Sequence, residues 1–174
     1  EILSGLVGSE MCIRDRYMHR KTDAELAALY QPILREHGIE VSDELAGRTA
    51  GIMKERATFT TDLWDLTSFF FVAPAEYEEK QAKKYWKGQN PAILRELRGV
   101  LEGIDDFSLE NTERIVHAWI EEKGYGMGQV MNTLRLALVG AGKGPGMYDV
   151  TSFIGKTECL KRIDNLLNNL KPAE

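Results

Sequence analysis

The chain has 174 residues, of which 43% are hydrophobic and 28% charged, a composition typical of a soluble globular protein with one domain or two small ones. The net charge of -5 argues against broad, non-specific nucleic-acid binding, which leaves a basic footprint, but it allows a local basic patch. Apolar runs such as Phe69 to Ala73 are too short to span a membrane, and two cysteines indicate neither a disulfide framework nor a zinc site, so we expect a cytoplasmic protein.

The first sixteen residues, EILSGLVGSEMCIRDR, differ in character from the rest of the chain. They show no clean helical or strand period, and they begin with an acid rather than with the basic region of a signal peptide. The string resembles a translated sequencing artefact that recurs at the ends of unrelated proteins. We therefore expect residues 1–16 to be non-native, and Cys12 falls away as a functional candidate.

Helical patterns begin at Thr22. Thr22 and Glu25 have the spacing of a capping box, and Gly38 ends the helix that they begin. Pro32 lies inside this helix and predicts a kink or a split. Ser42 begins a second helix, whose apolar positions are Leu45, Ile52 and Met53.

The middle of the chain continues in the same way. TTDLWDLTSFFF, residues 60–71, predicts a buried short helix or turn, with Trp64 in the core, and Ala73-Pro74 breaks it. Three helices are expected next: a charged one over Glu76–Trp86, one from Asn90-Pro91, and one that starts at the cap Ser108, buries Trp119 and ends before Gly124.

The last third predicts a helix over Gly128–Val139, a glycine-rich loop, a short helix over Met147–Ile154, Gly155, and a final helix from Thr157. No segment alternates convincingly as a strand would. We therefore expect an all-α fold, built of two small helical subdomains over residues 17–89 and 90–174 that meet near Gly88–Pro91.

The glycine-rich loop places four glycines and a proline between Gly140 and Gly146. A phosphate-binding P-loop needs a hydroxyl residue after its lysine, but Gly144 follows Lys143. A dinucleotide fingerprint from Gly140 would need its third glycine at Pro145, and the preceding segment has the pattern of a helix rather than of a strand. Both enzyme readings fail, which leaves a hinge between helices or a more specific role.

The order of several motifs is more specific. LRLAL (134–138), then PGMY (145–148), then Ile154-Gly155-Lys156 resembles the C-terminal part of the anticodon-binding region of bacterial glutamyl-tRNA synthetases. Upstream, Arg56 with Phe59 and Asp62-Leu63 is similar to another motif of that family, and QAKKYW (81–86) matches its lysine-aromatic helix. The resemblance runs from about Tyr17 to the C-terminus, and it implies a helix cage that binds the anticodon loop of glutamate tRNA.

The resemblance also implies roles for individual residues. The equivalents of Arg135, Pro145 and Met147 contact the first anticodon bases, and the equivalent of Arg56 reads the third and favours glutamate tRNA over glutamine tRNA. Where this family often has threonine the chain has Gly144, which leaves only a backbone contact. These residue types suit the task, since arginine can bond a base edge bidentately and glycines let backbone amides approach a splayed base.

A basic stripe accompanies these residues. Lys80, Lys83, Lys84 and Lys87 are spaced i, i+3, i+4 and i+7, which is one face of a helix, and Lys143 lies in the loop. Beside RNA these lysines could contact backbone phosphates. The alternative is an ordinary solvated face, partly neutralised by Glu76, Glu78 and Glu79.

No catalytic or metal-binding constellation is found: three scattered histidines form no ligand pattern, and the HIGH-like and KMSKS-like motifs of class I synthetases are absent. The resemblance therefore implies the C-terminal part of a monomeric glutamate–tRNA ligase that uses ATP and Mg²⁺, without its catalytic domain and without a cofactor in this part. A helical protein-interaction module without RNA binding remains an alternative, and a small-molecule enzyme would need a deep pocket with convergent titratable groups.

Overall fold

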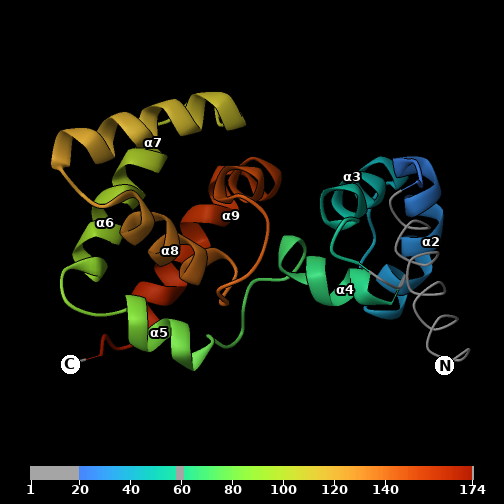
Figure 1. Cartoon of the computed structure of the whole chain (residues 1–174), viewed down its shortest axis with the longest axis horizontal. Helices are drawn as coiled ribbons and strands as arrows, with labels where there is room; N and C mark the ends of the chain where they lie inside the picture. Colours follow the sequence, from blue (N-terminus) through green and yellow to red (C-terminus); the bar gives the residue numbers. More distant parts are fainter. Residues whose placement is uncertain (1–19, 58–60, 174) are drawn as a thin grey trace, which may run out of the picture. The chain divides into compact units, whose positions relative to one another are not determined.

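The computed structural model describes residues 20–57 and 61–173, and the secondary structure of these residues is helical apart from one isolated bridge between Lys87 and Ala173 (Figure 1). The all-α prediction is confirmed. The helices are α2 (Asp23–Glu36), α3 (Asp43–Met53), α4 (Asp62–Thr67), the 3-10 helix η1 (Ser68–Phe70), α5 (Glu79–Tyr85), α6 (Asn90–Glu102), α7 (Leu109–Lys123), α8 (Met127–Leu138) and α9 (Met147–Asn169).

The chain forms two compact units, residues 1–71 and 72–174. Because α5 packs against α8, it belongs to the second of these units. The division into subdomains at residues 89 and 90 stays a prediction.

The first unit is built on the pair α2 and α3. Both halves of the predicted capping box form at the start of α2, where the Thr22 and Glu25 side chains each accept from the other residue's backbone N–H. Pro32 does not split α2, which is continuous from residue 23 to residue 36. Pro32 and Ala28, the residue whose carbonyl loses its helical partner, are both exposed, so water can satisfy that carbonyl.

Small residues bring α2 and α3 into close contact. Ala46, Gly47 and Ala50 are buried on α3, whereas Leu45 is only half-buried. A Cβ atom on Gly47 would lie 2.3 Å from the backbone oxygen of Asp23, so a side chain at this position would force the helices apart. Apolar size was therefore a poor guide to the buried face of α3.

Unit 1 is closed by α4 and η1. Leu63 is fully buried there, and the Tyr30 hydroxyl hydrogen-bonds the Thr67 hydroxyl, which in turn donates to the Leu63 carbonyl. Trp64 is half-buried at the edge of the core, contrary to the expectation of full burial. Its indole stacks on the ring of His37, an exposed residue, with 3.9 Å between the ring centroids.

The second unit is organised around α9, which packs against α6, α7 and α8 (Figure 1). Gly155 interrupts the helical backbone of α9 with φ 83 and ψ 166, which separates the two helices that the sequence predicted. Trp119 is buried, as expected. The main buried apolar side chains of this unit are Trp86, Ile93, Leu94, Leu97, Leu101, Val116, Ile120, Leu134, Leu138, Ile163 and Leu166.

Candidate nucleic-acid interface

The glycine-rich loop begins where α8 ends. Gly140 adopts the left-handed conformation with φ 77, and its N–H donates to the Leu136 carbonyl at 3.0 Å, which closes the last turn of the helix. Two further hydrogen bonds fasten the loop to the start of α5. The Gly140 carbonyl accepts from the Glu78 N–H at 2.7 Å, and the Gly142 N–H donates to the Glu78 carboxylate at 3.0 Å.

This docking requires a glycine at position 140, and at position 142 a side chain would force the flexible end of Gln81 to move. A Cβ atom on Gly140 would lie 2.7 Å from Cβ of Pro74, and one on Gly142 would lie 2.4 Å from the side-chain nitrogen of Gln81. The first half of the loop is therefore held tightly against the segment that leads into α5. A flexible hinge does not account for these glycines.

The second half of the loop, residues 143–147, is more open. Lys143 and Gly146 are exposed and Gly144, with φ 147, is half-buried, whereas the side chains of Pro145 and Met147 are buried. Met147 is only 4% exposed. The parts of this segment exposed to solvent are thus mainly the Lys143 side chain and glycine backbone. Contacts of Pro145 and Met147 with anticodon bases stay a prediction.

Arg135 lies in the last turn of α8, next to this loop. Its side chain is half-buried, and its carbonyl accepts from the Val139 N–H at 2.8 Å, so its backbone is fixed by the helix end. A role for Arg135 in base recognition stays a prediction.

The basic stripe is shorter than the sequence indicated. Lys80, Lys83 and Lys84 are exposed on α5, but the helix ends at Tyr85 and Trp86 has ψ 65, so Lys87 does not continue the same helical face. Trp86 turns inward and is 1% exposed, and burial of this large side chain ends the helix early.

The charges on α5 interact with one another. The Lys83 ammonium bonds the Glu79 carboxylate and lowers the pKa of that group, first through the hydrogen bond and then through the Coulomb attraction. The Lys84 ammonium lies 5.1 Å from the centroid of the Tyr85 ring.

Arg56 belongs to the first unit. It lies in the turn after α3, is exposed, and its N–H donates to the Met53 carbonyl at 2.9 Å, while the next residue, Ala57, is buried. Phe59, part of the same sequence motif, lies outside the described residues. Anticodon reading by both Arg56 and Arg135 would require the two to lie on one face; because they belong to different units, this stays a prediction.

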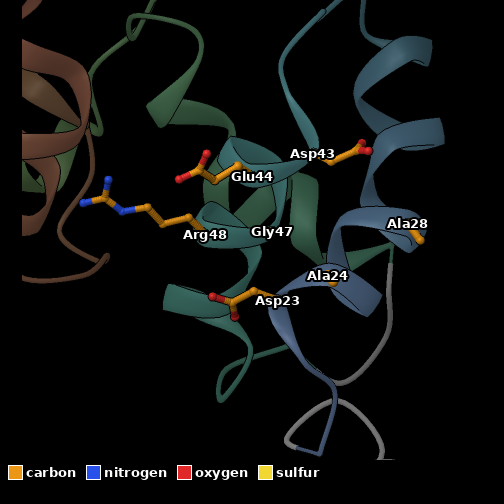
Figure 2. A pocket seen from close by; sticks show the side chains of 7 residues that line it. All are labelled: Asp23, Ala24, Ala28, Asp43, Glu44, Gly47 and Arg48. Atoms are coloured by element: carbon orange, nitrogen blue, oxygen red, sulfur yellow. The ribbon is translucent and has the colours of Figure 1, made fainter.

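A cavity of about 480 Å³ lies in the first unit, between the N-terminal halves of α2 and α3 (Figure 2). Figure 2 shows the Glu44 and Arg48 side chains on one side of α3 and Asp43 on the other. Three of its four charged side chains are carboxylates, which would repel RNA phosphates, and none of the predicted RNA contacts lines it. The lining residues are Asp23, Ala24, Ala28, Asp43, Glu44, Gly47 and Arg48.

Sequence reasoning missed the residues that hold the loop. The pattern around Glu78 and Gln81 is typical of an exposed charged helix, and nothing in their spacing indicated contact with residues 140–142. Arg162 was also missed: it is 1% exposed and donates to the Leu138 carbonyl at 2.9 Å. A signal for it existed, since Arg162 shares a helix face with Cys159, Ile163 and Leu166, which are all buried.

Other classes of site receive no support from the part of the chain that the structure describes. Residues 20–57 and 61–173 contain no group of three or more histidine, cysteine or acidic side chains that could hold a metal ion. Among the same residues, no helix combines the length and apolar character needed to cross a membrane.

Comparison with known proteins agrees with the resemblance seen in the motifs. A family model described as the anticodon binding domain matches residues 25–167. Glutamate–tRNA ligases of Phocaeicola vulgatus and Bacteroides fragilis are 50% and 48% identical over 155 residues, which are 89% of this chain and 31% of each relative. The chain therefore spans about a third of the length of these relatives.

Solved structures give the same result. The crystal structure of a glutamate tRNA ligase from Elizabethkingia meningosepticum in complex with its amino acid matches with a TM-score of 0.85 and 38% identity, over 91% of this chain and 31% of that one. Glutamate-tRNA synthetase from Elizabethkingia anophelis matches with a TM-score of 0.80 and 36% identity, over 90% of this chain and 30% of that one.

Proposed function

The chain belongs to the anticodon binding domain family, and on this premise we propose that it recognises the anticodon loop of glutamate tRNA as part of a glutamate–tRNA ligase. The relatives named above are enzymes of that kind. On this proposal the protein works in the cytoplasm as a monomer, and ATP and Mg²⁺ serve the ligase reaction rather than anticodon recognition.

The observation that carries the proposal is the docking of the glycine-rich loop on α5. It brings Arg135, the exposed backbone of Gly146, and the lysines of α5 to neighbouring parts of one unit. Arginine and glycine backbone suit the edges of unstacked bases, and lysines suit the phosphates that flank them. This combination is what an RNA loop requires of a protein surface.

For the third anticodon base we propose Arg56 as the reader. Arg56 is exposed just after the end of α3, and its backbone is held in place by the hydrogen bond to the Met53 carbonyl. The guanidinium therefore extends from a fixed backbone position. The planar fork of an arginine can form two parallel hydrogen bonds to a base edge, which a lysine cannot.

The alternative of a protein-interaction module finds little support. Among the described residues the large hydrophobic side chains that are clearly exposed are Val72, at 48%, and Met127, at 40%. They are isolated in the sequence, and scattered apolar residues are normal on a protein surface. A docking module for another protein would be expected to offer a contiguous apolar patch.

The proposal is tested by titrating the 174-residue chain with glutamate tRNA transcript at low salt, and with a transcript whose third anticodon base is changed. A good arginine-to-base contact gives roughly 1–3 kcal/mol of discrimination, or about 5- to 150-fold in Kd. Arg56→Ala should abolish this ratio. Arg35→Ala, which removes an exposed arginine of α2 in the same unit, should preserve it.

Each outcome has a clear meaning. A ratio that is lost with Arg56→Ala and kept with Arg35→Ala supports anticodon reading and its assignment to Arg56. Equal binding of both transcripts by the unmodified chain contradicts anticodon reading and leaves a non-specific RNA contact. Absence of binding to either transcript favours the protein-interaction module.

A further inference from the structure

A buried arginine of α9 contacts the C-terminal end of α8. Arg162, on α9, is 1% exposed, and its Nη1 donates to the Leu138 carbonyl at 2.9 Å. Its Nε donates to a carboxylate oxygen of Glu158, also at 2.9 Å, one turn earlier on α9. A charge this deeply buried is strongly destabilising unless it is paired and hydrogen-bonded, so these contacts are specific requirements of the fold.

The carbonyl that Arg162 binds is the last of α8. The helix-end carbonyls of Arg135 and Leu136 accept from the N–H groups of Val139 and Gly140, but Leu138 lies beyond that turn. A cation at a helix C-terminus is also favoured by the helix dipole. Arg162 therefore fixes the point at which α8, with Arg135 in its last turn, passes into the glycine-rich loop.

We infer that Arg162 is a positioning residue for anticodon recognition: through the Leu138 carbonyl it sets the geometry of Arg135 and of residues 139–142. The inference rests on the proposed function for its second half, the effect on RNA. Its first half, the control of loop geometry, concerns the chain alone and can be measured without RNA.

The test compares Arg162→Met with a matched control, Arg98→Met. Arg98 also makes charge-paired contacts to α9, through bonds of 2.5 and 3.0 Å to the Asp164 carboxylate, but it joins α6 rather than α8 to that helix. Both variants therefore lose an arginine that is ion-paired with a carboxylate of α9, and only Arg162 contacts the end of α8. Arg162→Lys keeps a cation near Leu138 and serves as the conservative variant.

The first readout is amide hydrogen exchange of Val139, Gly140 and Gly142 in the 174-residue chain without RNA. Loss of a hydrogen bond from a charged donor should speed exchange at these amides by about 10-fold or more in Arg162→Met. Arg98→Met should leave their rates unchanged, and Arg162→Lys should give intermediate rates. Equal effects of the Arg162 and Arg98 variants on these amides would overturn the inference.

The second readout is binding of glutamate tRNA transcripts with and without a change in the first two anticodon bases. Arg162→Met should reduce the discrimination, and in an Arg135→Ala background it should have little further effect, because both changes act on the same contact. A purely global destabilisation would instead add to the effect of Arg135→Ala and would also appear with Arg98→Met.

The two halves of the inference fail in different ways. If the unmodified chain does not discriminate between transcripts, the proposed function fails, and the exchange data still decide whether Arg162 controls the loop. If the unmodified chain discriminates and Arg162→Met does so equally well, the inference about recognition is overturned. If Arg162→Met does not fold, Arg162→Lys carries the test through the same comparison with Arg98→Met.

Discussion

Trp86 and Leu170 are separated by 84 positions in the sequence, yet the indole Nε1 of Trp86 donates to the Leu170 carbonyl at 2.8 Å. The Ala173 N–H completes the contact by donating to the Trp86 carbonyl at 2.8 Å. Trp86 is 1% exposed, so the chain that follows α9 covers the end of α5.

Replacing Trp86 should therefore destabilise the second unit. Trp86→Phe loses a buried hydrogen bond and leaves a cavity where the larger ring stood, and we expect the free energy of unfolding to fall by about 1–3 kcal/mol. Urea unfolding followed by circular dichroism measures this change. Trp119→Phe, a buried indole of the same unit, gives the cost of the smaller ring; an equal loss in both variants would show that the Leu170 bond contributes nothing.

Gly140→Ala should loosen the glycine-rich loop. The residue has φ 77 and its new Cβ would lie 2.7 Å from Cβ of Pro74, so both strain and overlap oppose the change. We expect a loss of about 1–3 kcal/mol in the free energy of unfolding. The control is Gly99→Ala, at an exposed helical position with open space around it, which should be neutral or stabilise the protein by up to about 1 kcal/mol. The midpoint of thermal unfolding should thus fall for Gly140→Ala and stay unchanged or rise for Gly99→Ala.

The Tyr30 hydroxyl should make the first unit sensitive to alkali. Burial raises the pKa of Tyr30 from 10.0 to about 12, an effect that the hydrogen bond between Tyr30 and Thr67 only partly opposes. Between these values the unfolded chain releases the tyrosine proton and the folded chain keeps it, so this contribution to stability is complete below pH 10 and is lost as the pH rises toward 12.

At neutral pH, Tyr30→Phe should lower the free energy of unfolding by about 1 kcal/mol, because the hydrogen bond to Thr67 is lost. Above pH 10 the free energy of unfolding should fall less steeply for this variant than for the unmodified chain. Urea unfolding at a series of pH values gives both quantities. Parallel curves for the two proteins would show that another group controls the alkaline transition.

The lysines of α5 should determine the salt dependence of RNA binding. If Lys80 contacts a phosphate, Lys80→Ala should lower the slope of log K against log salt by about 0.7–0.9 and weaken binding of all transcripts alike. Lys161→Ala removes an exposed lysine of α9 and serves as the control. An unchanged slope with Lys80→Ala would assign the α5 lysines to an ordinary solvated face.

Local signals in the sequence were reliable where one short segment decides the structure. The capping box at Thr22, the helix end at Gly124 with φ 71 and the break at Gly155 all follow from residues within a few positions of each other. The family motifs succeeded for a related reason, because their order along the chain carried information that no single motif held.

Long-range packing was much harder to predict. The burial of Trp86 depends on Leu170, and the docking of Gly142 depends on Glu78, so neither could be read from its own segment. The same holds for α5, whose contact with α8 groups it with the second unit. Pro32 was expected to kink or split α2; the helix is not split, and the kink stays a prediction. That Pro32 and Ala28 both face solvent, where water can satisfy the freed carbonyl, could not be read from the proline alone.

Gly155 divides α9 into two helical segments, a short rod (residues 147–154) and a long rod (residues 156–169). Residues 147–154 and 156–169 share no continuous helical backbone, since φ 83 and ψ 166 at Gly155 lie far from helical values. A displacement of Met147 or Tyr148 is therefore transmitted to the long rod through packing contacts rather than through a continuous ladder of helical hydrogen bonds. One such contact joins the Cys159 sulfur to the Thr151 carbonyl oxygen at 3.9 Å. The long rod is held to the end of α8 by Arg162, so the two rods are positioned by different contacts.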